Sequence, residues 1–151
     1  MAAQYLNVDL EVEGPRQLSH ILQEFSGSGI DCLGCFETER RGHFANFEVT
    51  ALPSDPNSIV SEFCDAIEGF REDAEATWAG AHRRTFDVGF DSDGSAGCSR
   101  FELTADTVRR AAELEASLGI TIYSLSDTPT EFHSPPEEET RNGSTVHRRP
   151  A

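Results

Sequence analysis

Two cysteines separated by two residues, Cys32 and Cys35, form the pattern with the most defined chemistry in this sequence. A CxxC pair is redox active where it begins a helix, because the helix dipole lowers the pKa of a thiol there. Here the pair begins a predicted strand, which turns the two sulfurs apart. A zinc site would need further ligands from His43, Cys64 or Cys98, and no second CxxC or HxxxH pair accompanies them. We therefore interpret the cysteines as reduced structural thiols, with Cys32 and Cys35 as weak metal candidates, and expect no cofactor.

An acidic run at residues 91–95, DSDGS, has the composition with which a calcium loop begins. The EF-hand loop requires glycine at its sixth position and glutamate at its twelfth. Counting from Asp91, these positions hold Ala96 and Glu102, and the run leads into a predicted strand. We interpret it as a β-turn.

No catalytic motif of fixed spacing is present, since GxSxG, HExxH, GxGxxG and the phosphate-binding loop are all missing from the sequence. An enzyme would have to assemble its site from dispersed residues such as His82, Arg83, Asp87 and Glu102. The alternative that we keep open is a small hydrolase-like enzyme with a cleft near Trp78, His82 and Arg83.

The charge of the chain limits its partners more firmly. The sequence has 27 acidic and 12 basic residues, a net charge of −15, and every basic residue is an arginine. Without lysine, neither a Schiff base nor a phosphate-loop lysine can form. An acidic surface repels the phosphates of nucleic acids and attracts basic proteins. We expect a basic protein partner and no nucleic acid.

The length of 151 residues suggests one domain with a sizeable core. No apolar run approaches the roughly 18 residues of a membrane span, and the first residues lack the pattern of a signal peptide. We therefore expect a cytoplasmic chain that does not enter a membrane. The oligomeric state stays open.

The periodicity of apolar residues predicts the elements that must position any site. In residues 5–12, Leu6, Val8, Leu10 and Val12 alternate with polar residues, which is typical of a half-buried strand. The expected elements are a strand at 5–12, a helix at 15–25, strands at 32–39 and 43–51, a helix at 56–70, a loop with one helical turn at 71–84, strands at 86–91 and 100–103, a helix at 105–118 and a strand at 120–125.

This order, β-α-β-β-α-β-β-α-β, predicts an α+β fold with one mostly antiparallel sheet, helices on one face and a ferredoxin-like first half. Residues 1–127 form the expected single domain. Residues 128–151 contain four prolines and an acidic run without periodicity. We expect this segment to be a disordered tail.

The pattern in residues 86–123, FDVGF followed by a turn and SRFELTADTVRRAAELEASLGITIY, resembles a family of small bacterial domains, domain-of-unknown-function family 4279. The matching residues are core and helix-cap positions, so the resemblance carries over no catalytic residue. Small acidic bacterial domains of this sort also resemble the immunity proteins of toxin systems. The resemblance therefore implies a binding function.

Turning the apolar residues of every strand toward the helices leaves a set of acidic residues on the opposite, open face of the sheet. These residues are Asp9, Glu11, Glu37, Glu48, Asp87, Asp91 and Glu102. One interpretation is a merely solvated face, and the other is a docking surface for a basic protein. The leading hypothesis is a non-enzymatic, immunity-type protein that occludes a basic bacterial toxin or effector. The alternatives are the small enzyme and a regulatory accessory domain whose tail recruits a partner.

Overall fold

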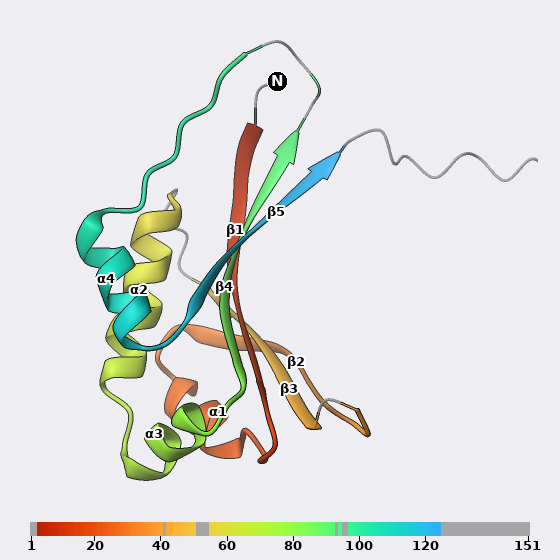
Figure 1. Cartoon of the computed structure of the whole chain (residues 1–151), viewed down its shortest axis with the longest axis vertical. Helices are drawn as coiled ribbons and strands as arrows, with labels where there is room; N and C mark the ends of the chain where they lie inside the picture. The colour runs from red at the N-terminus through yellow and green to blue at the C-terminus, as the bar shows by residue number, and fades with distance from the viewer. Residues whose placement is uncertain (1–2, 41, 51–54, 93, 95–96, 125–151) are drawn as a thin grey trace, which may run out of the picture.

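A computed structural model describes residues 3–40, 42–50, 55–92, 94 and 97–124 of the chain. The elements are β1 (Ala3–Gly14), α1 (Ser19–Phe25), β2 (Ile30–Thr38), β3 (Gly42–Val49), α2 (Pro56–Glu68), α3 (Glu72–Ala79), β4 (Arg83–Ser92), α4 (Ala105–Glu113) and β5 (Ser117–Ser124). The helices gather on one side of a single twisted sheet (Figure 1). The predicted α+β class with helices on one face is confirmed.

The sheet has the strand order β2-β3-β1-β4-β5, so the first strand of the chain lies at its centre. Every neighbouring pair is antiparallel except β4 and β5, which are parallel. In the order β2-β3-β1-β4, β3 lies between β1 and β2, which is the split arrangement of ferredoxin-like folds. The α4–β5 unit extends this arrangement at the β4 edge.

The core lies between the sheet and the helices. In β1, Val8, Leu10 and Val12 are buried as their alternation predicts. Leu6 departs from the prediction and is 45% exposed, because the pairing of β1 with β4 shifts register between Tyr5 and Asn7. This bulge turns Tyr5 toward the helix side, where its ring packs against Phe90 and Phe101.

The sequence predicts Asp55 and Thr104 as the N-caps of the helices at 56–70 and 105–118, and both caps are confirmed. The Asp55 side chain accepts a hydrogen bond of 2.9 Å from the backbone N–H of Ser58, and Pro56 occupies the first turn of α2. The Thr104 hydroxyl accepts a hydrogen bond of 3.3 Å from the N–H of Thr107 at the start of α4. These caps fix where each helix leaves its loop.

Residues 72–79 form a complete helix, α3, where the sequence predicted a loop with one helical turn. Its buried stripe is narrow, comprising Ala74, Thr77 and Trp78, which explains why the periodicity is weak. Acidic residues in its first turn interact favourably with the positive end of the helix dipole. The sequence also predicts that Trp78, within this segment, packs on the edge of the core, and this is confirmed because the residue is 6% exposed.

Residues 100–103 do not form the predicted returning strand. β1 and β5 occupy the two edges of β4, which leaves no edge of β4 with which this segment could pair as a returning strand. Phe101 instead packs its ring 4.8 Å from that of Phe90, between centroids. The apolar character that suggested a strand serves a packing contact.

The last helix is shorter than predicted, and it ends at Glu113 instead of Leu118. Glu115 takes a left-handed conformation with φ of 55°, and the N–H of Ala116 donates to the carbonyl of Ala111 at 2.9 Å. The sequence predicts that Gly119 ends this helix, but Gly119 is a residue of β5, where a Cβ atom would lie 3.0 Å from Asp87 Oδ1. A side chain at this position would therefore crowd the Asp87 carboxylate.

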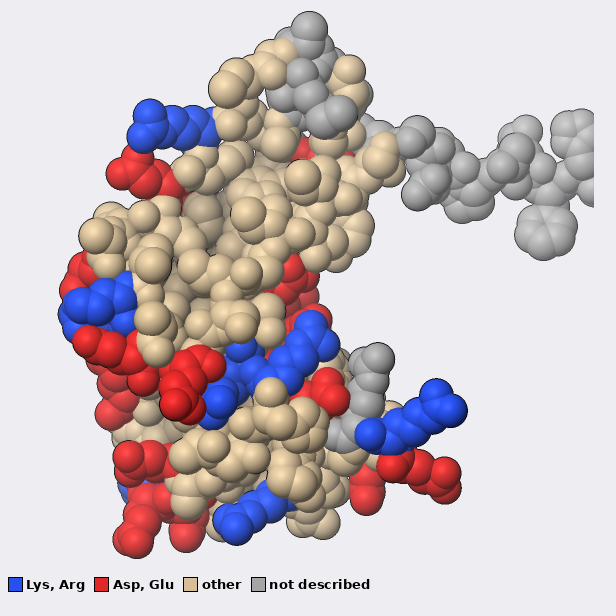
Figure 2. All heavy atoms as spheres, in the orientation of Figure 1, with Lys and Arg blue, Asp and Glu red and all other residues tan. Residues whose placement is uncertain are grey.

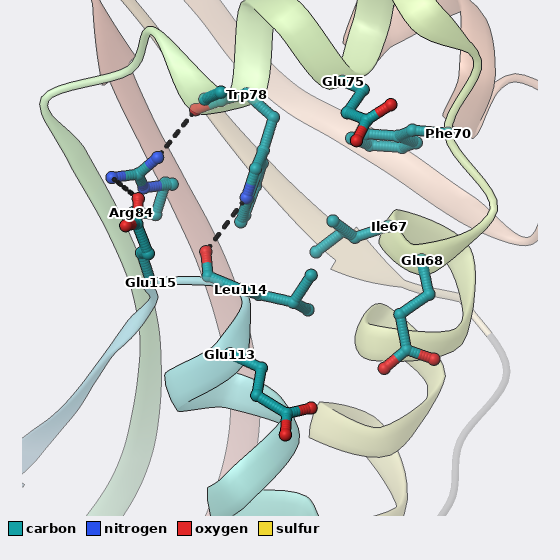
Figure 3. Close-up of a pocket in the computed structure, with 10 residues that line it drawn as sticks. Ile67, Glu68, Phe70, Glu75, Trp78, Arg84, Glu113, Leu114 and Glu115 are labelled. Carbon is teal, nitrogen blue, oxygen red and sulfur yellow. Dashed lines mark hydrogen bonds and ion pairs between the residues drawn. The ribbon is translucent and has the colours of Figure 1, made fainter.

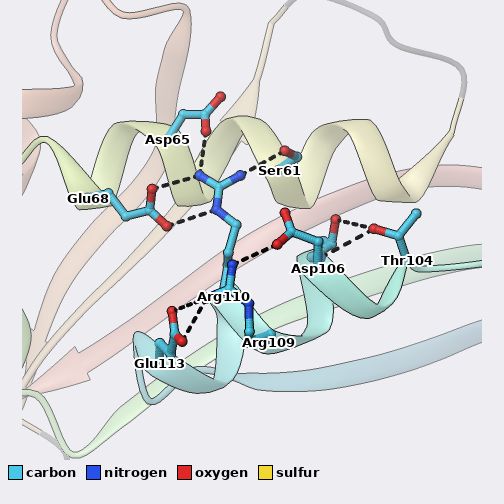
Figure 4. Close-up of polar contacts among 9 residues, drawn as sticks. Ser61, Asp65, Glu68, Thr104, Asp106, Arg109, Arg110 and Glu113 are labelled. Atoms are coloured by element: carbon cyan, nitrogen blue, oxygen red, sulfur yellow. Dashed lines mark hydrogen bonds and ion pairs between the residues drawn. The ribbon is translucent and has the colours of Figure 1, made fainter.

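An arginine joins α4 to α2. The Arg110 guanidinium, whose side chain is 14% exposed, donates to both Glu68 carboxylate oxygens at 2.8 Å, to Ser61 at 3.0 Å and to Asp65 (Figure 4). These carboxylates raise the pKa of Arg110 through their hydrogen bonds. Among the described residues, Arg109 pairs only within its own helix, with Asp106 and Glu113.

The predicted tail at residues 128–151 lies outside the described residues. Within the described part of the chain, no helix is both long and apolar enough to cross a membrane.

Candidate functional site

Four acidic side chains form a row across the open face of the sheet. The strand register pairs Asp31 of β2 with Glu48 of β3, Glu48 with Asp9 of β1, and Asp9 with Asp87 of β4. Directly paired residues point to the same face, and the chain neighbours of Asp9 and Asp87 are buried toward the helices. The four residues, called the acidic row below, therefore share the face away from the helices.

The acidic row is held by neutral hydrogen-bond donors. Asn7 Nδ2 donates to Asp9 Oδ1 at 2.9 Å, and Thr121 Oγ1 lies 2.9 and 2.8 Å from the two carboxylate oxygens of Asp87. Among the described residues, no arginine or histidine forms an ion pair with any member of the row. The row is thus oriented but not neutralised by these residues.

The position of Asp9 within the acidic row raises its pKa. Partial burial raises its pKa, and the negative charges of Glu48 and Asp87 raise it further, while a hydrogen bond from Asn46 acts in the opposite direction. Holding Asp9 ionised therefore costs free energy in the folded protein. A positive charge brought to this face would offset the part of that cost that comes from Glu48 and Asp87.

Further along β1, the carboxylates of Glu11 and Glu13 lie beside arginine or histidine side chains. Arg83 Nη2 lies 2.6 Å from Glu11 Oε2, and Arg83 Nη1 lies 3.9 Å from Glu13 Oε2. His82 Nε2 approaches Glu13 Oε1 at 3.3 Å. Glu11 therefore lies on the open face as predicted, but Arg83 compensates its charge.

The remaining predicted residues of the face do not join the row. Glu37 pairs with His43, which alternates with buried Ala45 and Phe47, so it lies on the helix side of the β2–β3 hairpin. Its Oε1 atom is 4.0 Å from His43 Nε2. The prediction for Glu37 is wrong, because the register irregularity in β2 between Cys32 and Gly34 changes which residues face outward.

Asp91 and Glu102 occupy other positions. Asp91 lies on the same side of β4 as Asp87, but four residues further along the strand, which is about 13 Å. Glu102 does not lie on the sheet, because its segment forms no strand. It accepts a hydrogen bond of 2.8 Å from Arg100 Nη2 and lines a groove on the helix side, so its predicted place on the open face is wrong.

Asp31 belongs to the row although the sequence reading did not include it. The predicted strand began at Cys32, whereas β2 begins at Ile30. Ile30 is buried and precedes a charged residue, and this alternation could have extended the strand by two positions. The missed residue extends the row from the centre of the sheet to its β2 edge.

The residues of the enzyme alternative do not converge. A hollow of about 290 Å³ beside Trp78 is lined by Arg84 and by side chains of α2, α3 and the end of α4 (Figure 3). In this hollow Trp78 Nε1 donates to the Leu114 carbonyl at 3.0 Å, and Arg84 Nη1 donates to the Trp78 carbonyl at 2.8 Å. His82 and Arg83 do not line it and pair with β1 carboxylates.

The cysteines show no arrangement suited to catalysis. Cys32 and Cys35 are free thiols on the edge strand β2, and both residues are exposed. The partial burial of the Cys32 sulfur raises its pKa, whereas a reactive thiol has a lowered one. Cys64 is buried in the core, and burial raises its pKa to about 11. Within residues 3–124, apart from the undescribed positions, no three metal-binding side chains of the His, Cys, Asp or Glu type come together.

Comparisons with known proteins give no relative: no family model, no curated protein and no solved structure matches this chain.

Proposed function

We propose that this chain is a non-enzymatic binding protein whose open sheet face, centred on the acidic row, docks on a basic protein. The most specific form of the proposal is an immunity-type protein that occludes a basic toxin or effector. The immunity-type part depends on the resemblance of residues 86–123 to small bacterial domains. The docking part depends on the electrostatics of the open face.

One observation carries the proposal. The strand register places four carboxylates side by side, and none of them has an ion-pair partner among the described residues. Like charges placed directly opposite one another on a sheet destabilise it. The neighbouring row with Glu11 shows that the fold can place an arginine beside a carboxylate on this face. A basic partner would supply to the acidic row the charge that Arg83 supplies to Glu11.

Complementary charge also explains how such a partner would be selected. The net charge of −15 steers basic proteins toward the chain and repels nucleic acids and acidic proteins. Oriented carboxylates on a rigid sheet lose little conformational freedom on binding. The row would therefore act on the association rate and on partner choice more than on total affinity.

The test replaces Asp9, Glu48 and Asp87 together by Asn, Gln and Asn. The control replaces the exposed helix residues Glu62, Glu72 and Asp73 by Gln, Gln and Asn, which removes the same charge from the other side of the molecule. Association is measured at low salt by stopped flow with the product of the neighbouring gene, and lysozyme serves as a reference for non-specific attraction. We expect the row variant to associate at least about tenfold more slowly and the control two- to threefold more slowly.

The immunity-type reading has its own measurement. Co-expression of the wild-type chain with the neighbouring gene product should restore growth, and the row variant should restore it less than the control does. Equal effects of the two triple variants on association would reject the docking face. Binding without any block of toxicity would reject only the immunity type.

A further inference from the structure

The last strand, β5, forms an uncharged edge of the sheet. It pairs with β4 on one side, and no described strand pairs with its other side. Its sequence, SLGITIYS, contains no charged residue, proline or bulge over eight residues. An edge of this kind exposes backbone hydrogen-bonding groups to which another strand can pair.

β5 also exposes apolar side chains on its helix side. Leu118, Ile120 and Ile122 pair with the buried residues Phe86, Val88 and Phe90 of β4, yet they are 40%, 70% and 63% exposed. Short helix α4 leaves them uncovered, and the part of the surface where β5 lies is almost free of charged atoms (Figures 1 and 2). These three residues are called the β5 strip below.

The β5 strip continues into the body of the molecule. A groove of about 280 Å³ separates it from the segment that carries Phe101 and Leu103, and apolar residues of β4 and β5 line most of the groove. Phe101 is itself 39% exposed. Contiguous apolar surface of this kind marks an interaction site more often than scattered single residues do.

We propose that the β5 edge binds a second copy of this chain, with the two β5 strands antiparallel and the two sheets joined into one. A two-fold axis through the middle of the strand would place Ile120 of one copy opposite Ile122 of the other, so the strip is complementary to itself. Two molecules of net charge −15 repel each other, so they can associate only along a surface that adds no carboxylates to the contact, and β5 carries none.

The joined sheet has a geometric consequence. A two-fold axis perpendicular to the sheet turns both open faces to the same side. The two acidic rows would then lie on the same face of the joined sheet. Each row would end at Asp87 of its own β4, which is separated from the axis by β5. The dimer itself does not depend on the proposed function, because its evidence comes from the other side of the sheet.

The test measures the mass of the full-length protein by sedimentation from about 1 to 100 µM, a range that covers typical weak and moderate dimers. We expect a concentration-dependent dimer, and Ile120→Glu should raise its dissociation constant at least about 100-fold, because a carboxylate would have to be buried in the interface. The control is Leu33→Glu on the opposite edge strand, at a residue that is 54% exposed, and this variant should dimerise like the wild type.

A second measurement covers the case in which Ile120→Glu disturbs the fold. Hydrogen exchange of the β5 amides in the wild-type protein should slow as concentration rises through the dissociation constant, while exchange in β2 stays unchanged. A protein that is monomeric at 100 µM overturns the proposal. Loss of the dimer by Leu33→Glu instead of Ile120→Glu overturns it as well, as does protection of β5 that is independent of concentration.

Discussion

The two edge strands of the sheet solve the problem of an open edge differently. β2 carries Asp31 and Glu37 and has a register irregularity beside Leu33, and both features oppose the addition of another strand. β5 has neither a charge nor a bulge, and two of its isoleucines are more than 60% exposed. The molecule therefore protects one edge and leaves the other able to pair.

The difference follows from how each edge is attached. β2 belongs to a hairpin with β3, whose antiparallel partners are adjacent in the chain. β5 is parallel to β4 and reaches its place through the long segment after β4 and the helix α4. The acidic row starts on β2 and ends on β4, and at the corresponding position of β5 stands Gly119. The acidic row on the open face thus ends one strand before the edge that carries the apolar strip.

The largest effect on stability is expected from a side chain added at Gly119 of β5, and the matched control is a side chain added at Gly34 of β2. In Gly119→Val, the new Cβ would meet Asp87 Oδ1 at 3.0 Å and Thr85 Cγ2 at 3.2 Å, so the Asp87 side chain, which Thr121 holds in place, must shift. We expect a loss of about 1–3 kcal/mol in the free energy of unfolding, as for other overpacked sites. In Gly34→Val on β2, the contact is the exposed Phe36 ring at 3.0 Å, which can rotate away.

Urea unfolding of the two glycine variants makes the comparison. We expect the Gly34 variant to change by less than about 0.5 kcal/mol, with valine favoured in a strand. A Gly119 variant as stable as the wild type would mean that β5 is loosely attached.

A smaller effect is expected from the arginine that holds α4, the helix that precedes β5. In Arg110→Ala the helix α4 loses its hydrogen bonds to Ser61, Asp65 and Glu68, and we expect a loss of about 1–2 kcal/mol. Amide exchange in α4 and β5 should accelerate, while that in β2 should not. Arg109→Ala, which removes an exposed arginine paired only within α4, should leave stability and exchange unchanged.

The smallest effect concerns the acidic row. Because the pKa of Asp9 is raised in the folded protein, its contribution to stability is present in full below the ordinary pKa of an aspartate and is lost as the pH rises through the raised value. Asp9→Asn removes the charge at this position, and we expect its free energy of unfolding at pH 7 to exceed that of the wild type by a few tenths to about 1 kcal/mol. Urea unfolding at pH 7 and near pH 3 measures it, and the gain should vanish at the lower pH.

Much of the fold could be predicted because alternation and caps are local. The β1 residues Val8, Leu10 and Val12 and the caps Asp55 and Thr104 lie where the sequence placed them. The failure of the predicted strand at residues 100–103 has a cause that is not local. Whether residues 100–103 pair depends on which strands already occupy the edges of β4, and no short pattern contains that information.

The residues of the candidate site could be predicted where their strands are regular and were misplaced elsewhere. Asp9, Glu48 and Asp87 follow from alternation within regular strands, and the register then aligns them. Glu37 was misplaced by an irregularity within its own strand, and Glu102 by a strand that does not form. The β5 edge could not be predicted at all, since the sequence of a strand does not tell whether a neighbour covers its side chains.

The central position of β1 also sets the order of assembly. The first strand of the chain pairs with β3 on one side and with β4 on the other, as in the pairs Asp9–Glu48 and Asp9–Asp87. The pairing with β3 closes a shorter loop than the pairing with β4, so it costs less chain entropy. During synthesis from the N-terminus, β1, β2 and β3 emerge well before β4, and one edge of β1 stays unpaired in that interval. The strand at the centre of the finished sheet is thus the one that waits for its second neighbour while the chain is being made.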